Sequence, residues 1–356
     1  MSPGGPADPG ALPAGLLAPA MEALRQQTGI VIPVYFARPQ DAGLARALLE
    51  DTVAACLAHL GDPGRLCLSA DGEEYGGRIV QELAQRHGVE AHVGARHQGK
   101  LQALRDGVAR LWARGELRWV AVLDMDGDHF ANELANLVRA AQFARQRGRM
   151  EEVLVVGRRT SRHRPMGFLR GELEELADRV LLDALAYRAA LDGVPLRLDY
   201  ATAVEEYPDF HSGYKLFSRR AAQAAFLEEP RLCGASAEGY FRHGCEAVMV
   251  TEALQAGAQL VLVNRSTLNE QPVSSFGLLD RTRMVADKMI WPCRRLGVPA
   301  AFADQWLRHH LVRLQLATLV PQGREELVRI RQLVLEGLGA AELAAAEVDF
   351  WGPLFV

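Results

Sequence analysis

A regular alternation of short apolar segments with longer amphipathic segments is the feature that most constrains the fold of this chain. It runs from about residue 30 to residue 156, and the longer segments have the apolar spacing of helices. Such alternation is typical of a mostly parallel sheet with helices on both faces. The sequence therefore predicts an α/β fold, with strands at 30–36, 65–69, 89–93, 119–123 and 152–156 and helices at 44–60, 76–87, 99–114 and 132–147.

The second half of the chain has a less regular pattern. Its apolar spacing predicts helices at 170–191 and 246–255, strands at 212–217 and 259–263, and mostly helix after about residue 278. The first residues are rich in Pro, Gly and Ala, which favours a mobile segment. We therefore expect a flexible tail over 1–29, a catalytic domain over 30–270 and a helical extension over 271–356.

The composition is that of an ordinary globular protein and excludes several classes. A net charge of −4 gives no electrostatic reason to expect nucleic acid as a partner. No apolar run approaches the roughly 20 residues of a transmembrane helix, no secretory signal is evident, and the five cysteines form no C-x-x-C pair, so we expect a cytoplasmic enzyme. Of the 40 basic residues only three are lysines, namely Lys100, Lys215 and Lys288. A GC-rich genome explains this bias, and a lysine that persists under it can serve as a compact ammonium.

Three aspartates follow the predicted strand at 119–123. Asp124, Asp126 and Asp128 stand at alternate positions, and in an extended segment such side chains point the same way. Three carboxylates in one pocket would repel each other, and a hard divalent cation such as Mg²⁺ or Mn²⁺ would remove that repulsion. The pattern therefore predicts a metal site that can clamp a diphosphate.

The acidic cluster also has other interpretations. A calcium loop of EF-hand type fails, because His129 stands where glycine is needed and Ala135 where glutamate is needed. A haloacid-dehalogenase-type phosphatase would use Asp124 as nucleophile and Asp126 as acid/base. Against it, the motif follows about the fourth strand instead of the first, and Asp128 replaces the usual Thr or Val. This phosphatase and a merely polar loop at a strand end both stay open.

Further motifs occur in order around the acidic cluster. They are Ile32-Pro33-Val34-Tyr35, Ala70-Asp71-Gly72, Gln98-Gly99-Lys100-Leu101-Gln102-Ala103-Leu104, Val155-Val156-Gly157-Arg158-Arg159 and Asp209-Phe210-His211-Ser212-Gly213-Tyr214-Lys215-Leu216-Phe217. With Asp124-Met125-Asp126 among them, they resemble the motifs of family 2 glycosyltransferases, closest to the dolichyl-phosphate mannose synthase group. The resemblance covers about residues 30–263. It implies a GT-A-type nucleotide-diphospho-sugar transferase fold.

The resemblance implies that the first motifs bind the donor. Pro33 and Tyr35 would line the nucleotide base, and Asp71 would contact the base or the ribose, although an Asp-Gly turn explains Asp71 equally well. Lys100 stands at the start of a predicted helix, where backbone N–H groups and the helix dipole favour a phosphate.

The later motifs carry the remaining polar groups. By the same resemblance Asp124 would contact the sugar-nucleotide, and the metal would be held by Asp126 with Asp128, and by Asp124 if all three converge. Arg158 and Arg159 would assist at the phosphates of donor or acceptor, for which guanidinium groups are suited. They open a basic segment that a solvated loop would also explain, continuing with Arg162, His163, Arg164 and Arg170.

Together these residues predict a metal-dependent transfer of a sugar from a GDP- or UDP-sugar to a phosphate-bearing lipid or a small anionic acceptor. By the resemblance Asp209 would lie close to the donor sugar and recognise its hydroxyls or act as a general base. If the acceptor is a hydroxyl, Asp209 is the first candidate for the general base and Glu246 the second. The resemblance favours inversion, although soluble synthases of phosphoglycerate or glycerate glycosides share the fold and retain configuration. An inactive nucleotide-sugar-binding protein is a further alternative, which Phe36-Ala37 in place of the family's Asn-Glu favours. A peripheral membrane contact and a homo-oligomer are compatible with this interpretation.

Overall fold

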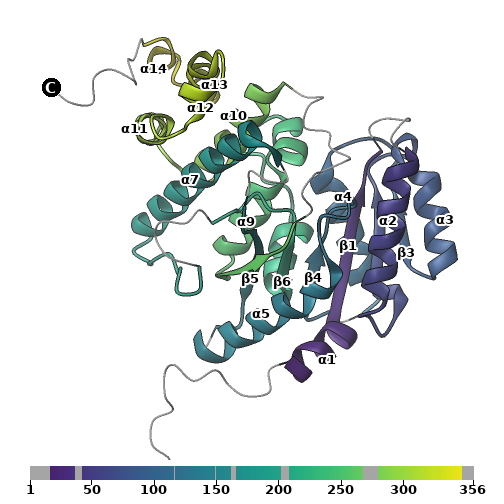
Figure 1. The fold of residues 1–356 in the computed structure, drawn as a ribbon. Coiled ribbons are helices and arrows are strands. Elements are labelled where there is room, and N and C mark those ends of the chain that lie inside the picture. The colour runs from purple at the N-terminus through teal and green to yellow at the C-terminus, as the bar shows by residue number, and fades with distance from the viewer. Residues whose placement is uncertain are drawn as a thin grey trace, which may run out of the picture.

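A seven-stranded sheet forms the centre of the protein (Figure 1), as seen in a computed structural model that describes residues 17–36, 42–115, 117–148, 150–161, 166–201, 208–267 and 280–346. The strand order is β3-β2-β1-β4-β6-β5-β7. All neighbouring strands are parallel except β6, which runs antiparallel to both β4 and β5. The strands are β1 (Thr28–Val34), β2 (Leu66–Ala70), β3 (Glu90–Val93), β4 (Trp119–Val122), β5 (Val153–Arg159), β6 (Lys215–Ser218) and β7 (Gln259–Arg265).

Helices cover both faces of the sheet, as the alternating pattern predicts. Successive side chains of a strand point to opposite faces, so in β1 Val31 joins one hydrophobic cluster while Ile30 and Ile32 join the other. One face is covered by α1 (Leu17–Gln27), α2 (Ala42–Leu57), α3 (Gly77–His87) and α5 (Leu134–Gly148). The other is covered by α4 (Lys100–Trp112), α7 (Phe168–Leu191), α9 (Cys245–Gln255) and α10 (Arg281–Arg295). The predicted α/β class is confirmed.

Short helical turns connect these elements. They are η2 (Pro63–Arg65), η3 (Glu73–Tyr75), η4 (Ala131–Glu133), α8 (Arg219–Ala222), η5 (Gln223–Leu227) and η6 (Gly239–His243). Within the described ranges, no helix combines the length and the apolar character that crossing a membrane requires.

Helix α1 corrects the predicted tail over residues 1–29. Ala20, Ala23 and Leu24 are buried against the neighbouring helix α5, because side chains three and four positions apart share one face of a helix. The next strand begins at once, and the Thr28 hydroxyl donates a hydrogen bond to the carbonyl oxygen of Ala23 at 2.9 Å. Residues 17–29 are therefore part of the folded core, and residues 1–16 lie outside the described part of the chain.

The substitution Leu24→Ala tests this correction. Leu24 is fully buried, so its truncation should lower the free energy of unfolding by about 2 kcal/mol, the lower end of the usual range, because α1 lies at the edge of the fold. Urea unfolding measures the change, and Glu22→Ala on the exposed face of the same helix is the matched control. Equal stability of the two variants would show that α1 does not pack on the core and that this segment belongs to the flexible tail.

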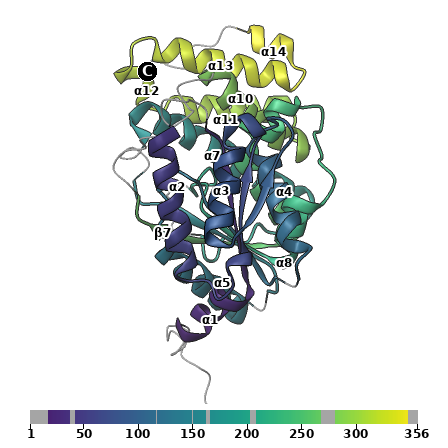
Figure 2. The same ribbon diagram turned by 90° about the vertical axis from the view of Figure 1, so that its right-hand side faces the viewer.

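The C-terminal region is helical, as predicted, but it does not form a separate core. After α10 it contains α11 (Ala300–Leu311), α12 (Leu316–Leu319), α13 (Gly323–Gly337) and α14 (Ala341–Ala345), which lie at the end of the molecule opposite α1 (Figures 1 and 2). Met289 and Trp291 of α10 belong to the same hydrophobic cluster as Val248 of α9. The apolar face of α10 thus completes the core of the predicted catalytic domain, and the division of the chain at residue 270 stays a prediction.

Candidate functional site

Polar side chains gather where the parallel strands end and the antiparallel strand begins. Lys215, the first residue of β6, is opposite Val122 of β4 and Val156 of β5. Because β6 runs in the reverse direction, the loop before it meets the loop after β4. The sequence places its acidic motif in one of these loops and Asp209 in the other, so the two motifs lie at the same edge of the sheet.

Lys100, Asp124 and Glu246 form an ionic cluster at this edge. The Lys100 ammonium lies 2.6 Å from the carboxylate of Asp124 and 2.8 Å from that of Glu246. Burial alone would lower the pKa of Lys100, but the two carboxylates outweigh it and raise that pKa well above its usual value. Burial would raise the pKa of Glu246, but the lysines lower it to about 2. Burial would also raise the pKa of Asp124, but the Lys100 ammonium lowers it, so all three groups are charged at neutral pH.

The ionic cluster bears on two expectations, the shared location of Lys100 and Asp124 and the general-base role of Glu246. Lys100 and Asp124 share one site, as their motifs predict. Glu246 also belongs to it, but a carboxylate with a pKa of about 2 is a weak base. The general-base role predicted for Glu246 is therefore not supported, and its evident task is to compensate the charge of Lys100.

Gly213 holds Asp124 in place by its lack of a side chain. A Cβ atom added to Gly213 would overlap the carboxylate of Asp124. A glycine before β6 thus lets the loop from 208 to 214 lie directly against the residue after β4. This close approach explains the Ser212-Gly213 motif physically.

The substitution Gly213→Ala should therefore disturb the site. The added methyl group must displace Asp124 from Lys100, and overpacking of this kind costs about 1–3 kcal/mol. We expect a lower melting temperature and weaker nucleotide binding, both measurable by thermal unfolding. The matched control is Gly43→Ala in α2, where an added Cβ meets nothing within 4 Å and stability should be nearly unchanged. An unperturbed Gly213→Ala protein would show that Asp124 can move freely.

The three aspartates do not converge on one point, in contrast to the prediction. Asp128 is buried and paired with Arg265 of β7 at 3.1 Å, and its backbone N–H donates a hydrogen bond to Asp126 at 3.2 Å. The segment is a turn in which Gly127 has a φ of 77°, so alternate side chains no longer point the same way. Among the described residues, no group of three acidic, histidine or cysteine side chains could hold a metal ion.

Asp126 nevertheless fits a divalent cation that is shared with a ligand. It forms no ion pair within the described part of the chain. Burial and the neighbouring carboxylates of Asp124 and Asp128 raise the pKa of Asp126 to about 7. A cation would relieve this repulsion, and Mg²⁺ is commonly bound by one or two carboxylates together with phosphate oxygens and water. The residues present therefore fit a metal held jointly by Asp126 and a diphosphate, not a cage of three carboxylates.

Asp71 fixes the loop that leads into α4. Its carboxylate accepts hydrogen bonds from the backbone N–H groups of Gln98 at 2.8 Å and Gly99 at 3.0 Å, and it lies 2.7 Å from Nδ1 of His97. These contacts occupy the carboxylate, so the predicted contact with the base or ribose is not supported. Asp71 instead helps to place Lys100, which follows this loop as the first residue of α4.

Of the two residues predicted to line the base, only Tyr35 reaches the surface. Its ring stacks on the imidazole of His97 with 4.6 Å between ring centroids. Pro33 is buried in β1 opposite Ser69 of β2, so its predicted contact with the base is not supported. His97 is a residue that the sequence interpretation missed, and its place directly before the Gln98-Gly99-Lys100 motif is the signal that could have indicated it. Ala37 lies outside the described residues.

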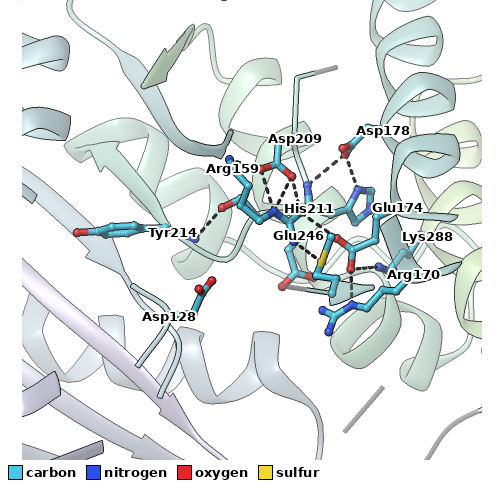
Figure 3. A network of polar contacts seen from close by, with 12 residues as sticks. Asp128, Arg159, Arg170, Glu174, Asp178, Asp209, His211, Tyr214, Glu246 and Lys288 are labelled. Atoms are coloured by element: carbon cyan, nitrogen blue, oxygen red, sulfur yellow. Dashed lines mark hydrogen bonds and ion pairs between the residues drawn. The ribbon is translucent and has the colours of Figure 1, made fainter. Parts of the chain in front are cut away.

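Arg158 and Arg159 lie inside β5, which continues three residues beyond its predicted end. Arg159 is buried, and its backbone N–H and guanidinium both donate to Asp209, with the backbone contact at 2.7 Å (Figure 3). It also pairs with Glu174 of α7 at 2.9 Å. Arg158 is buried too and donates to Asn264 at 2.9 Å. These contacts give no support to the predicted phosphate-binding role of Arg159, and Arg158 lies in a strand instead of on a loop.

Asp209 is likewise a structural residue. It is fully buried, both of its carboxylate oxygens accept hydrogen bonds from Arg159, and its φ of 55° marks a tight turn. A carboxylate so engaged cannot reach an acceptor, so the predicted role of general base is not supported. Of the predicted basic segment, Arg162, His163 and Arg164 lie outside the described residues.

A second set of polar residues beneath this site was missed by the sequence interpretation. In Figure 3 Glu174 and Asp178 of α7 face Arg159 and His211, and Nδ1 of His211 lies 2.6 Å from Asp178. Four acidic residues of α7 are buried, which is unusual for a helix face packed on a core. The available signal was the concentration of acidic residues in the first half of this helix: Glu172, Glu174, Glu175 and Asp178.

No protein-family model matches this chain, and no curated protein matches it. Among solved structures it is similar to the glucosyl-3-phosphoglycerate synthase of Mycobacterium tuberculosis in complex with Mn²⁺, uridine diphosphate and glucosyl-3-phosphoglycerate, with 16% sequence identity and a TM-score of 0.45 over 81% of this chain and 87% of that one. It is also similar to S. aureus TarS, with 12% identity and a TM-score of 0.43 over 90% of this chain and 50% of that one. TarS 1-349 in complex with UDP matches with 12% identity and a TM-score of 0.41 over 89% and 83%. Such remote similarity leaves the function to be inferred from the residues of the site.

Proposed function

We propose that this protein is a GT-A-type glycosyltransferase that uses Mg²⁺ or Mn²⁺ to transfer a sugar from a nucleoside-diphosphate sugar to a phosphate-bearing or small anionic acceptor. The observation that carries the proposal is the pairing of two features at one edge of the sheet. Asp126 has no cationic partner among the described residues, and Lys100 stands close by at the first turn of α4. In a metal-bound diphosphate, the metal would supply the cation that Asp126 lacks, and the phosphate oxygens would accept hydrogen bonds from Lys100.

Each residue at this edge has a distinct task in donor binding. The stacked rings of Tyr35 and His97 offer a flat surface to a nucleobase. Lys100 and the backbone N–H groups at the start of α4 favour phosphate oxygens. Asp124, with 29% of its side chain exposed, can accept hydrogen bonds from sugar hydroxyls. Asp126 would hold the metal, which neutralises the charge of the departing diphosphate.

The site favours an acceptor that is already a nucleophile. Asp209 is fully buried, and the pKa of Glu246 is about 2, so neither is suited to remove a proton from a hydroxyl. A phosphate oxygen needs no strong base. This supports an anionic acceptor, whereas inversion at the anomeric carbon and kinship with the dolichyl-phosphate mannose synthase group stay predictions.

Thermal unfolding with GDP-, UDP-, ADP- and dTDP-sugars, each with and without Mg²⁺ or Mn²⁺, tests the proposal. A ligand that binds the native state at 100 times its Kd stabilises it by about 2.7 kcal/mol. We expect at least one nucleotide sugar to raise the melting temperature only when metal is present, and product analysis with anionic acceptors to detect sugar transfer. If no nucleotide sugar raises the melting temperature with either metal, the proposal is wrong.

Two alternatives make opposite forecasts in the same experiments. A binding protein without catalytic activity would show the metal-dependent shift but neither sugar transfer nor hydrolysis of the donor. A phosphatase would hydrolyse p-nitrophenyl phosphate and lose this activity in Asp124→Asn. The fold disfavours the phosphatase, because its motif is expected on the first strand of the core and here follows β4, next to an antiparallel strand.

The remaining predictions concern location and assembly. A cytoplasmic location, a peripheral membrane contact and a homo-oligomer all stay predictions. Co-sedimentation with vesicles tests the membrane contact, and analytical ultracentrifugation tests the oligomer.

A further inference from the structure

His129 is a buried residue at the end of the acidic turn. Only 2% of its side chain is exposed, and Nδ1 of its ring accepts a hydrogen bond from the backbone N–H of Asp124 at 2.8 Å. A ring nitrogen that accepts a hydrogen bond carries no proton, so the imidazole is neutral and Nε2 bears its hydrogen. The side chain at one end of the turn therefore holds the backbone at the other end.

This hydrogen bond closes the acidic turn into a ring that contains Asp126. The turn includes Gly127, whose φ of 77° lies in a region where glycine gives the backbone much freedom. Asp128 is fixed separately by its ion pair with Arg265 at 3.1 Å. The contacts of His129 and Asp128 together restrict the backbone on both sides of Asp126.

The imidazole ring is itself held by Tyr214. The two rings stack with 4.8 Å between their centroids and 12° between their planes. Tyr214 is fully buried, directly precedes β6, and donates a hydrogen bond from its hydroxyl to the carbonyl oxygen of Phe130 at 2.9 Å. The turn after β4 is thereby fastened to the start of β6. Stacking needs only a flat ring, so the acceptor at Nδ1 is the contribution that is specific to histidine.

We propose that His129 is a positioning residue of the donor site, which holds Asp124 and Asp126 in the arrangement that binds a metal-bound diphosphate. It acts through the backbone of Asp124, whose carboxylate lies 2.6 Å from the ammonium of Lys100. Without the acceptor, the turn would spend part of its time in other conformations. If the competent conformation is populated one tenth of the time, the apparent Kd of the donor rises about tenfold. The role in donor binding rests on the proposed function, whereas the hydrogen bond to Asp124 does not.

Substitutions at this position separate the acceptor from the ring. Asparagine places its Oδ1 where Nδ1 lies, because both atoms are bonded to Cγ, and phenylalanine keeps a flat ring without an acceptor. We expect His129→Phe to raise the Kd of UDP about tenfold in isothermal titration with Mn²⁺ present, and His129→Asn to keep most of the affinity although it loses the stack on Tyr214. A purely structural role of the ring would give the opposite order. The matched control is His310→Phe in α11, which removes a pair with Asp183 at 2.6 Å and should leave UDP binding unchanged.

Hydrogen exchange of the Asp124 amide, followed by NMR, gives a readout that needs no ligand. We expect slow exchange in the wild type and in His129→Asn, and exchange at least about tenfold faster in His129→Phe, because the amide has lost its acceptor. Equal exchange in the wild type and His129→Phe overturns the proposal, and so does equal affinity of these two proteins for UDP.

A second variant keeps the test decisive if His129→Phe does not fold. His129→Gln then takes its place, since its amide oxygen lies one bond further from the backbone than Nδ1, and equal UDP affinity of His129→Gln and His129→Asn overturns the proposal. If UDP does not bind the wild type while exchange at Asp124 still depends on His129, the donor assignment fails and the hold of His129 on the turn stands. If UDP binds the wild type and His129→Phe equally well, the donor assignment stands and the positioning role fails.

Discussion

Replacing Asp126 with asparagine is expected to abolish the effect of Mg²⁺ or Mn²⁺ on donor binding and to lower the rate of sugar transfer by about 100-fold or more. Asp126 is the one aspartate of the motif without an ion pair in the described structure, and its carboxylate is crowded by Asp124 and Asp128. A cation held there stabilises the charge that develops on the leaving diphosphate, and the loss of such stabilisation typically costs about 100- to 1000-fold in rate. Thermal shifts with nucleotide sugar and metal, followed by transfer assays, measure both effects.

Asp128→Asn is the matched control, since it removes the same charge two residues away. Asp128 is engaged with Arg265, so this variant should lose stability, because Arg265 stays buried without its partner. The metal-dependent part of the thermal shift should remain. A metal effect that survives in Asp126→Asn but disappears in Asp128→Asn would reverse the assignment of the ligand.

Replacing Asp209 with asparagine should destabilise the fold by about 3 kcal/mol, because breaking a buried ion pair leaves a charge without compensation. Arg159 would lose its bidentate partner but keep Glu174, which places the effect at the lower end of the usual range. Urea unfolding measures this change. Transfer activity is measured on the protein that remains folded, at low temperature.

The comparison with Glu246→Gln separates structure from catalysis. Glu246 contacts Lys100 within the donor cluster, so this variant should weaken donor binding more than it lowers stability. Asp209→Asn should do the reverse. Unchanged stability together with lost transfer in Asp209→Asn would restore the predicted role of general base.

The architecture was predictable because it depends on local patterns. Alternating apolar segments gave nearly all strands and helices within a few residues of their observed ends, and parallel strands bring their carboxyl ends to one edge whatever the loops contain. The same reasoning predicted that Lys100 and Asp124 lie at one edge of the sheet, where the structure shows them in contact. It failed for 17–27, where Leu17, Met21 and Leu24 are the only large apolar residues and the preceding segment is rich in proline, glycine and alanine.

The geometry of the acidic motif could not be predicted from spacing. Alternate aspartates share a direction only in extended backbone, and Gly127 with its positive φ turns the chain after Asp126. Asp128 then meets Arg265, a residue of β7 that no local pattern connects to it. Among the described residues the three aspartates therefore do not form the predicted set of ligands, and a metal site at Asp126 stays a proposal.

The sequence by itself determined the α/β class, the edge of the sheet at which the polar motifs meet, and the presence of an acidic motif beside a lysine. Only the tertiary structure decided which charges are available to a ligand and which are neutralised. The reason is that ion-pair partners lie far apart along the chain, 146 residues for Lys100 and Glu246 and 50 residues for Arg159 and Asp209. A charged residue is free or engaged according to such distant partners, and periodicity carries no information about them.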